Sequence, residues 1–180
     1  LSEESPQQRW PVAATLGDIA EDHPDEVLAT DLMDDLVALL NDGQVREREH
    51  AARTLATIAD EYPEEVLAAD PLEELITLLD DGSGLTRKHA VRAIATMAGE
   101  YPEEVLTADP LDDLIALLDG DSKFKQKYAA RSLGKIAKDY PEEVLAANPL
   151  EDLVGLLSDE KCRKKAAFTI GYLARGDPKA

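Results

Sequence analysis

A phrase of about twenty residues recurs along this chain at a fixed period. "PEEVLAADPLEELITLLDDG" begins at Pro63, and "PEEVLTADPLDDLIALLDGD" begins 39 residues later, at Pro102. The segments 63–101 and 102–140 are identical at 20 of 39 positions. Because a period of 20–50 residues is typical of solenoids, in which each unit buries its apolar face against its neighbours, we expect a repeat protein.

The period also predicts the domain organisation. We expect one repeat domain over residues 11–175, with an N-terminal tail (1–10) and a C-terminal tail (176–180). The domain would divide into a leading half-repeat at 11–22 and four repeats at 24–62, 63–101, 102–140 and 141–175.

Each repeat is expected to contain three helices. Pro63 can occupy a first helical position, where no amide hydrogen is needed, so it would begin a short first helix. Asp70 is expected to cap a second helix that Pro71 opens. The buried stripe of this second helix would consist of Leu75, Ile76, Leu78 and Leu79.

A longer third helix is predicted from about residue 85 to residue 100. Its buried side would carry Val91, Ile94, Ala95 and Ala98. Small residues at inner positions of the third helices would let neighbouring helices approach closely: Ala56, Ala95, Gly134 and Gly171. No segment shows sustained alternation of apolar and polar residues, so no strand is expected.

The three-helix unit "PEEVLAADPLEELITLLDD" followed by "AVRAIATMA" resembles the armadillo repeat, with the HEAT repeat as a close relative. The resemblance implies an all-α, right-handed α-α superhelix of four three-helix repeats of 39 residues plus an N-terminal half-repeat. Armadillo proteins typically bind extended peptides through Trp and Asn columns on the third helices. Here those columns read Arg53, Arg92, Arg131 and Phe168, and Thr57, Thr96, Lys135 and Tyr172.

Charge is strongly segregated within the repeats. The stretches that hold the first two helices of each repeat contain 26 acidic residues and no Lys or Arg: 24–43, 63–82, 102–121 and 141–160. The other 100 residues contain the remaining 12 acidic residues and all 19 basic ones. The acidic phrase therefore predicts one carboxylate-rich face, and the basic residues are confined to the third helices and the termini.

The exposed side of the third helices is the predicted partner-binding face. Its stripe steps by three or four residues and runs His50, Arg53, Thr57; His89, Arg92, Thr96; Tyr128, Arg131, Lys135, Lys138; and Lys165, Phe168, Tyr172, Arg175. Arg53, Arg92 and Arg131 would be the anchors, because the guanidinium fork matches carboxylate or phosphate oxygens. The supporting contacts would be His50, His89, Tyr128, Lys135, Phe168 and Tyr172.

The function predicted from this face is a non-enzymatic scaffold that binds a protein or peptide, with an extended acidic peptide as the ligand. In an alternative interpretation, the third-helix arginines pair with carboxylates of neighbouring repeats. A nucleic-acid-binding module is a second alternative, which a net charge of -19 disfavours through repulsion. A third is a structural spacer that self-associates end to end, since aromatic residues lie near both ends of the chain.

The composition predicts a source and a compartment. A twofold excess of acidic over basic residues with only 4% aromatic residues is typical of a hypersaline cytoplasm, so we expect a halophilic archaeon, with an ordinary acidic protein as the alternative. Cys162 is the only cysteine, which excludes an intramolecular disulfide and favours the cytoplasm. No stretch is long and apolar enough to span a bilayer, and the first ten residues do not resemble a signal peptide.

No catalytic residue, cofactor or metal site is expected. His50 and His89 recur at the repeat period, but their helices would lie about 8–10 Å apart, too far for a shared zinc ion without further ligands. "DGDS" at 119–122 only weakly resembles a calcium loop and is expected to be a turn. Cys162 is expected to be an inert or mildly reactive surface thiol. The paired carboxylates begin helices in every repeat, so we expect capping and solvation rather than acid–base catalysis.

Overall fold

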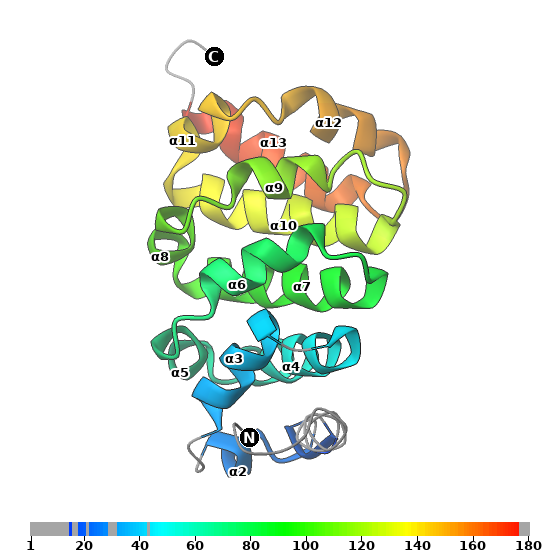
Figure 1. The fold of residues 1–180 in the computed structure, drawn as a ribbon. Coiled ribbons are helices and arrows are strands. Elements are labelled where there is room, and N and C mark those ends of the chain that lie inside the picture. Colours follow the sequence, from blue (N-terminus) through cyan, green and yellow to red (C-terminus); the bar gives the residue numbers. More distant parts are fainter. Residues whose placement is uncertain (1–14, 16–17, 21, 29–31, 43, 177–180) are drawn as a thin grey trace. The chain divides into compact units, whose positions relative to one another are not determined.

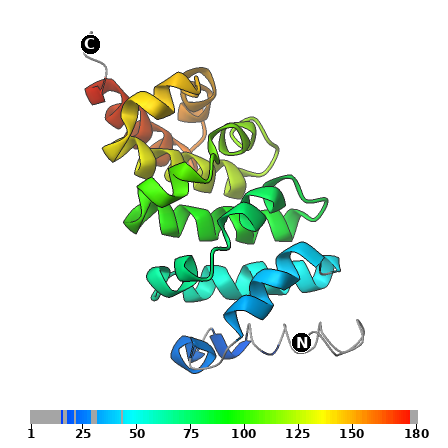
Figure 2. The same cartoon turned by 60° about the vertical axis from the view of Figure 1, so that its left-hand side comes forward.

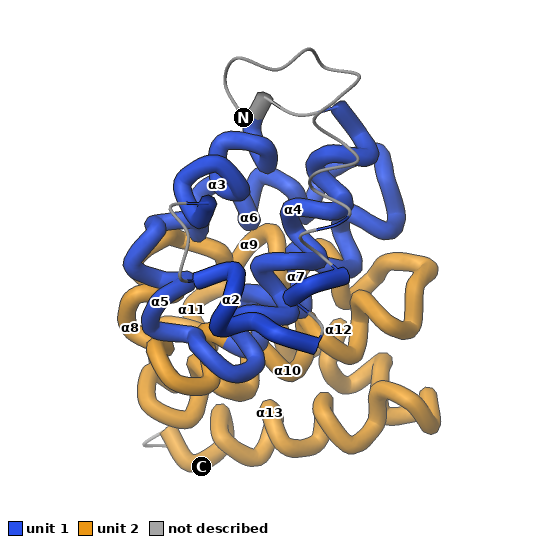
Figure 3. Tube along the Cα trace, turned by 90° about the horizontal axis from the view of Figure 1, so that it is seen from below, with its two compact units in different colours: residues 1–96 blue, residues 97–180 orange. Residues whose placement is uncertain are grey.

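The computed structural model describes residues 15, 18–20, 22–28, 32–42 and 44–176, and every regular element among them is helical (Figure 1). The chain forms two compact units, residues 1–96 (unit 1) and residues 97–180 (unit 2), shown in Figure 3. The predicted tail 1–10, most of the half-repeat 11–22 and residues 177–180 lie outside the described residues.

Unit 1 holds the first two predicted repeats, except for the last residues of the second. Its elements are α2 (Pro24–Leu28), α3 (Met33–Asp42), α4 (Val45–Ile58), α5 (Pro63–Ala68), α6 (Leu72–Thr77), the 3₁₀ helix η1 (Leu78–Asp80) and α7 (Gly84–Glu100), which crosses into unit 2. Helix α3 packs against α4, a crossing that can be followed in Figure 2. A second helix of a repeat thus lies against the long third helix.

Unit 2 repeats this arrangement. Its elements after α7 are α8 (Pro102–Thr107), α9 (Leu111–Ala116), α10 (Lys123–Asp139), α11 (Pro141–Ala146), α12 (Leu150–Gly155), the 3₁₀ helix η2 (Leu156–Ser158) and α13 (Arg163–Gly176). Helices α10 and α13 pack along each other, and α11 and α12 lie against α13 (Figure 1). The contact between α10 and α13 is the main interface of unit 2, and it positions the candidate site.

Local sequence signals account for most helix boundaries. Pro63 begins α5 and the predicted third helix is α7, so both predictions are confirmed. The predicted buried set of that helix is fully buried: Val91, Ile94, Ala95 and Ala98. The second helix differs from the prediction, because its α-helical part ends at Thr77 and the apolar stripe continues in the tighter turn of η1.

The small residues of the third helices have different surroundings. Ala56, Ala95 and Gly134 are buried as predicted, but Gly171 is exposed. A Cβ built on Gly171 would meet no atom within 4 Å among the described residues, whereas one on Gly134 would lie 2.5 Å from Thr169 Oγ1. The prediction of an inner position at residue 171 is therefore wrong, because α13 is the last helix of its unit to pack on that side.

The prediction that Asp70 caps the second helix is also wrong, and the equivalent residues of the next two repeats behave in the same way. Asp70, Asp109 and Asn148 have positive φ values of 52°, 57° and 66°, and the N-cap positions are occupied by the prolines that follow. The Asp109 N–H donates to the Leu106 carbonyl at 3.0 Å, which ends α8 in a left-handed turn. Asp and Asn tolerate this conformation better than most residues, so the residue ends the first helix instead of starting the second.

We expect Asp109→Val to lower the free energy of unfolding by about 1–2 kcal/mol, because a β-branched side chain is disfavoured in the left-handed region. Asp109 is exposed, so the substitution removes no core contact. Urea denaturation followed by circular dichroism measures the effect. Asp109→Gly is the control, since glycine adopts this backbone without strain, and equal losses for both variants would contradict the explanation.

Candidate functional site

The nine predicted partner-binding residues all lie on the long third helices of their repeats. They are distributed as His50 and Arg53 on α4, His89 and Arg92 on α7, Tyr128, Arg131 and Lys135 on α10, and Phe168 and Tyr172 on α13. The first four belong to unit 1 and the last five to unit 2, so the two groups are described separately.

In unit 1 the predicted anchors hold carboxylates of the chain itself. Arg53 Nη2 lies 3.4 Å from Asp18 Oδ1, and Arg92 Nη2 forms an ion pair with Asp60 Oδ2. The Thr96 hydroxyl also donates to Asp60 Oδ1, at 3.0 Å. These contacts follow the internal-pairing alternative for both arginines, since each guanidinium already has an acceptor.

The same part of unit 1 contains a histidine in a cationic environment. The pKa of His89 is lowered to about 4, mainly by desolvation on burial and in part by the repulsion of the imidazolium by Lys88 and Arg92. Its Nδ1 is buried with no hydrogen-bond partner among the described residues. His89 is therefore neutral at pH 7 in the folded protein. A neutral imidazole offers no positive charge to an acidic ligand, so His89 is a poor candidate for the predicted contact.

Acid should destabilise the protein through His89. Its folded pKa of about 4 lies below the unfolded value of 6.5, so the unfolded chain binds the proton first as the pH falls. The resulting decrease in the free energy of unfolding begins near pH 6.5 and is complete near pH 4. It amounts to about 2 kcal/mol after allowance for the partial exposure of His89.

The measurement is urea denaturation of the wild type and of His89→Gln at pH 7 and pH 4. The carboxylates titrate alike in both proteins, so the change in their stability difference between the two pH values isolates the histidine. On acidification, the free energy of unfolding of His89→Gln should rise by about 2 kcal/mol relative to that of the wild type. A pH-independent difference would contradict the lowered pKa.

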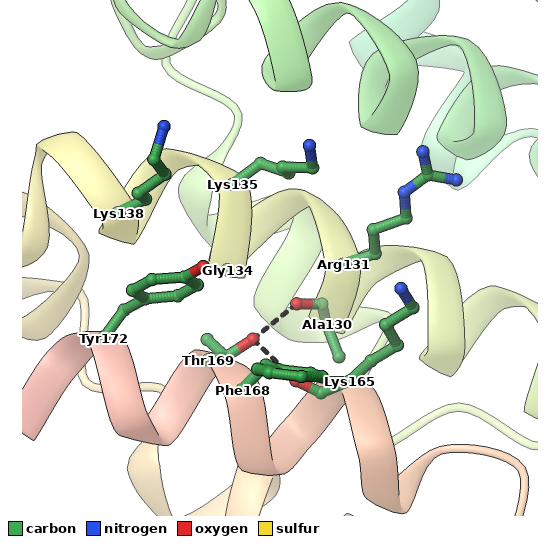
Figure 4. Close-up of a pocket in the computed structure, with 9 residues that line it drawn as sticks. All are labelled: Ala130, Arg131, Gly134, Lys135, Lys138, Lys165, Phe168, Thr169 and Tyr172. Atoms are coloured by element: carbon green, nitrogen blue, oxygen red, sulfur yellow. Dashed lines mark hydrogen bonds between the residues drawn. The ribbon is translucent and has the colours of Figure 1, made fainter.

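In unit 2, four of the five predicted residues line a pocket between α10 and α13. The pocket has a volume of about 310 Å³ and is lined by Ala130, Arg131, Gly134, Lys135, Lys138, Lys165, Phe168, Thr169 and Tyr172. Figure 4 shows that Lys165 extends from α13 toward the side on which the α10 cations project, and that the ring of Tyr172 extends toward Gly134. We call this site the α10–α13 pocket.

The α10–α13 pocket is cationic and its positive charge is poorly compensated. Four of its nine lining residues are basic and none is acidic. Within the described part of the chain, the only ion pair of these four joins Lys138 Nζ to Asp139 Oδ2 at 3.9 Å. Burial, and then repulsion led by Arg131, lowers the pKa of Lys165. An anionic group is the ligand that such a site can stabilise.

The floor of the pocket is held by a buried hydroxyl. Thr169 Oγ1 lies 2.7 Å from the Ala130 carbonyl oxygen and 3.0 Å from the Lys165 carbonyl oxygen, so its single hydrogen is shared between helix α10 and its own helix (Figure 4). The close approach of the helices is possible because residue 134 is a glycine. This hydroxyl is occupied, and the ligand-facing groups are the cations and the two rings.

The sequence predicted the pocket incompletely. Lys138 and Lys165 belong to the predicted stripe but not to the predicted binding set, although both line the pocket. Tyr128 is among the predicted partner contacts and does not line it. Its ring stacks on Phe124 with a centroid separation of 4.4 Å, and the guanidinium carbon of Arg131 lies 5.9 Å from its centroid. Tyr128 can therefore orient Arg131 from outside the pocket.

Cys162 and residues 119–122 are the remaining features that the sequence brought into consideration. Cys162 is buried, with Sγ 3.5 Å from the Lys123 carbonyl oxygen, and burial raises the pKa of its thiol, so the prediction of a surface thiol is wrong. Residues 119–122 lie in the bend that connects α9 to α10, where the sequence predicted a turn. Among the described residues, no group of three or more His, Cys, Asp or Glu side chains could hold a metal ion. None of the described helices is long and apolar enough to cross a membrane.

Comparisons with known proteins give no match among family descriptions or curated sequences. Several solved structures are similar. An engineered protein is 31% identical over 99% of this chain and 80% of its own, with a TM-score of 0.89. A designed armadillo repeat protein is 30% identical over 98% and 81%, with a TM-score of 0.85. Another, in complex with the peptide (KR)4, is 29% identical over 98% and 80%, with a TM-score of 0.86.

These similarities confirm the predicted all-α superhelical repeat fold. They do not bear on the predicted halophilic source, because these similar proteins are themselves engineered or designed. That source stays a prediction, as does the cytoplasmic location.

Proposed function

Because this chain belongs to the armadillo repeat proteins, we propose that it is a non-enzymatic scaffold that binds an acidic segment of a partner protein at the α10–α13 pocket. The observation that carries the proposal is the gathering of Arg131, Lys135, Lys138 and Lys165 around one pocket of a chain whose net charge is -19. The rings of Phe168 and Tyr172 add apolar contact area beside these charges.

The proposed ligand is opposite in charge to the (KR)4 peptide that one similar designed protein binds. Here the cations lie on the third helices and would repel a basic peptide. Arg53 and Arg92 contribute less than the sequence predicted, since their guanidinium groups hold Asp18 and Asp60. The anchor of the proposed site is therefore Arg131, supported by Lys165.

The test is a fluorescence anisotropy titration with labelled (DE)4 and (KR)4 peptides. The double variant Arg131→Gln/Lys165→Gln should lose at least about tenfold in affinity for (DE)4, because it removes two charge-assisted contacts of about 1.5–3 kcal/mol each. Lys161→Gln/Lys164→Gln is the matched control, since both lysines are exposed, lie outside the pocket and carry the same total charge. Equal losses in both variants would mean unspecific attraction and would reject the site.

We propose self-association through the last repeat as a second candidate function. Leu150 and Val154 on α12 are 40% and 57% exposed. Their counterparts one repeat earlier are better covered, since Leu111 is 9% exposed and Ile115 is half-buried. Leu150 and Val154 are aliphatic, like Leu111 and Ile115, which are covered by other parts of the chain. A second copy of the protein is therefore the partner that we propose for this surface.

Sedimentation velocity over a concentration series tests this second candidate. The wild type should show a mass that rises with concentration, and Val154→Glu should stay monomeric because a carboxylate would be buried in the contact. Glu151→Asp, on the same helix and exposed, serves as the control. A wild type that is monomeric at all concentrations would exclude self-association.

A further inference from the structure

The repeat explains why Arg131 and Lys135 have no ion-pair partner among the described residues. In unit 1, Arg92 and Thr96 both hold the carboxylate of Asp60. One period of 39 residues later, Arg131 corresponds to Arg92 and Lys135 corresponds to Thr96. Gly99 stands at the position of Asp60, so a hydrogen atom replaces the side chain that carries the carboxylate. Unit 2 thus keeps the guanidinium, gains an ammonium group and loses the anion that neutralises the equivalent site.

The position left by that carboxylate lies beside the pocket. A Cβ built on Gly99 would lie 3.2 Å from Lys135 Nζ, so an anion attached at this point would contact a lining residue of the pocket directly. No carboxylate among the described residues forms an ion pair with Arg131, Lys135 or Lys165. An external anion would therefore take the role that Asp60 has in unit 1.

The number of cations favours a doubly charged ligand. Arg131, Lys135 and Lys165 present three positive charges that have no ion-pair partner in the described part of the chain, and their mutual repulsion contributes to the lowered pKa of Lys165. A carboxylate supplies one negative charge, whereas a phosphoryl group supplies about 1.5–2 charges and three acceptor oxygens. The guanidinium fork of Arg131 can bind two of these oxygens at once.

The aromatic wall favours a ring next to that phosphoryl group. Phe168 is 55% exposed although it is a large apolar side chain, and Tyr172 lies one helical turn away on the same face of α13. Aromatic pairs are stabilised beyond their buried area by about 0.5–1.5 kcal/mol. A ligand ring could cover both side chains while its phosphoryl group reaches the cations.

We propose that the α10–α13 pocket binds a phosphorylated tyrosine of the partner, with the phosphoryl group between Arg131 and Lys165 and the ring against Phe168 and Tyr172. The inference rests on the proposed function, because it names the residue of the partner that enters the same pocket. A polynucleotide fits less well, since its many phosphates would also face the carboxylates of a chain with a net charge of -19.

The first test compares short acidic peptides that differ only at a central residue, which is tyrosine, phosphotyrosine, phosphoserine or glutamate. Anisotropy titrations at physiological salt should give the phosphotyrosine peptide at least about tenfold higher affinity than the tyrosine and glutamate peptides, equivalent to about 1.4 kcal/mol. Phosphoserine should fall between them, because it lacks the ring. Inorganic phosphate at the same concentration should not displace the phosphotyrosine peptide.

The second test restores the missing carboxylate. Gly99→Asp should occupy Arg131 and Lys135 internally and lower phosphotyrosine affinity at least about tenfold. Gly99→Asn, with the same shape and no charge, should lower it less than about threefold. Both residues are better helix formers than glycine, and circular dichroism verifies that each variant is folded.

The outcomes separate this inference from the function on which it rests. If the glutamate and phosphotyrosine peptides bind equally, the scaffold binds acidic segments and the phosphotyrosine inference is overturned. If no acidic peptide binds, both are overturned. Equal losses in Gly99→Asp and Gly99→Asn, or tighter binding of a single-stranded oligonucleotide than of the phosphotyrosine peptide, would also overturn the inference.

Discussion

Leu133→Ala is expected to lower the free energy of unfolding by about 2–5 kcal/mol, because it truncates a core side chain of unit 2. Leu133 lies on α10 and is fully buried, at 0% exposure. The substitution removes the transfer free energy of the lost atoms and leaves a cavity in the core of the unit. Urea denaturation monitored by far-ultraviolet circular dichroism gives the difference in unfolding free energy.

Val154→Ala is the control for this prediction. Val154 is also an aliphatic residue on a helix of unit 2, but it is 57% exposed. Its truncation should change the unfolding free energy by no more than about 0.5 kcal/mol. Similar losses in Leu133→Ala and Val154→Ala would mean that α10 does not form the core of its unit.

The second large effect is expected at Gly134. Alanine would normally stabilise a helix interior relative to glycine by about 1 kcal/mol. At this position its Cβ would lie 2.5 Å from Thr169 Oγ1 and 3.5 Å from Thr169 Cα. Helix α13 would have to move and the hydrogen bond to Ala130 would weaken, so Gly134→Ala should lower the unfolding free energy by about 1–3 kcal/mol.

Two further variants identify the cause. Gly171→Ala, on the exposed side of α13, should raise the unfolding free energy by up to about 1 kcal/mol, because a Cβ there meets no atom of the described residues within 4 Å. Thr169→Ala removes the clashing oxygen, so the double variant Gly134→Ala/Thr169→Ala should be more stable than the sum of the single effects predicts. Additive effects would show that the close approach of Gly134 to Thr169 is not the constraint.

The helical repeat could be predicted from the sequence because it depends on local patterns. The period of the acidic phrase, the proline at each helix start and the apolar spacing of the third helix act over a few residues. The structure confirms them in α5, α7 and the buried side of α7. The left-handed residues before the prolines were missed, because an Asp-Pro pair is equally compatible with a helix N-cap.

The candidate site could be predicted only in part. Helical spacing placed Arg131, Lys135, Phe168 and Tyr172 on one exposed stripe, and all four line the α10–α13 pocket. The sequence could not tell which arginines already had a partner, because an ion pair joins residues about a repeat apart. The pairs Arg53 with Asp18 and Arg92 with Asp60 became visible only in the folded unit.

By itself, the sequence determined the class of fold, the helix order and the segregation of charge, because periodicity and proline chemistry are written within each repeat. Tertiary structure alone decided that Cys162 is buried, that Gly134 is a contact point while Gly171 is not, and that Arg92 is neutralised while Arg131 lacks an ion-pair partner among the described residues. Each of these outcomes depends on which atoms of other elements contact the residue. The sequence of one repeat does not specify these contacts, because identical residues in successive repeats have different neighbours.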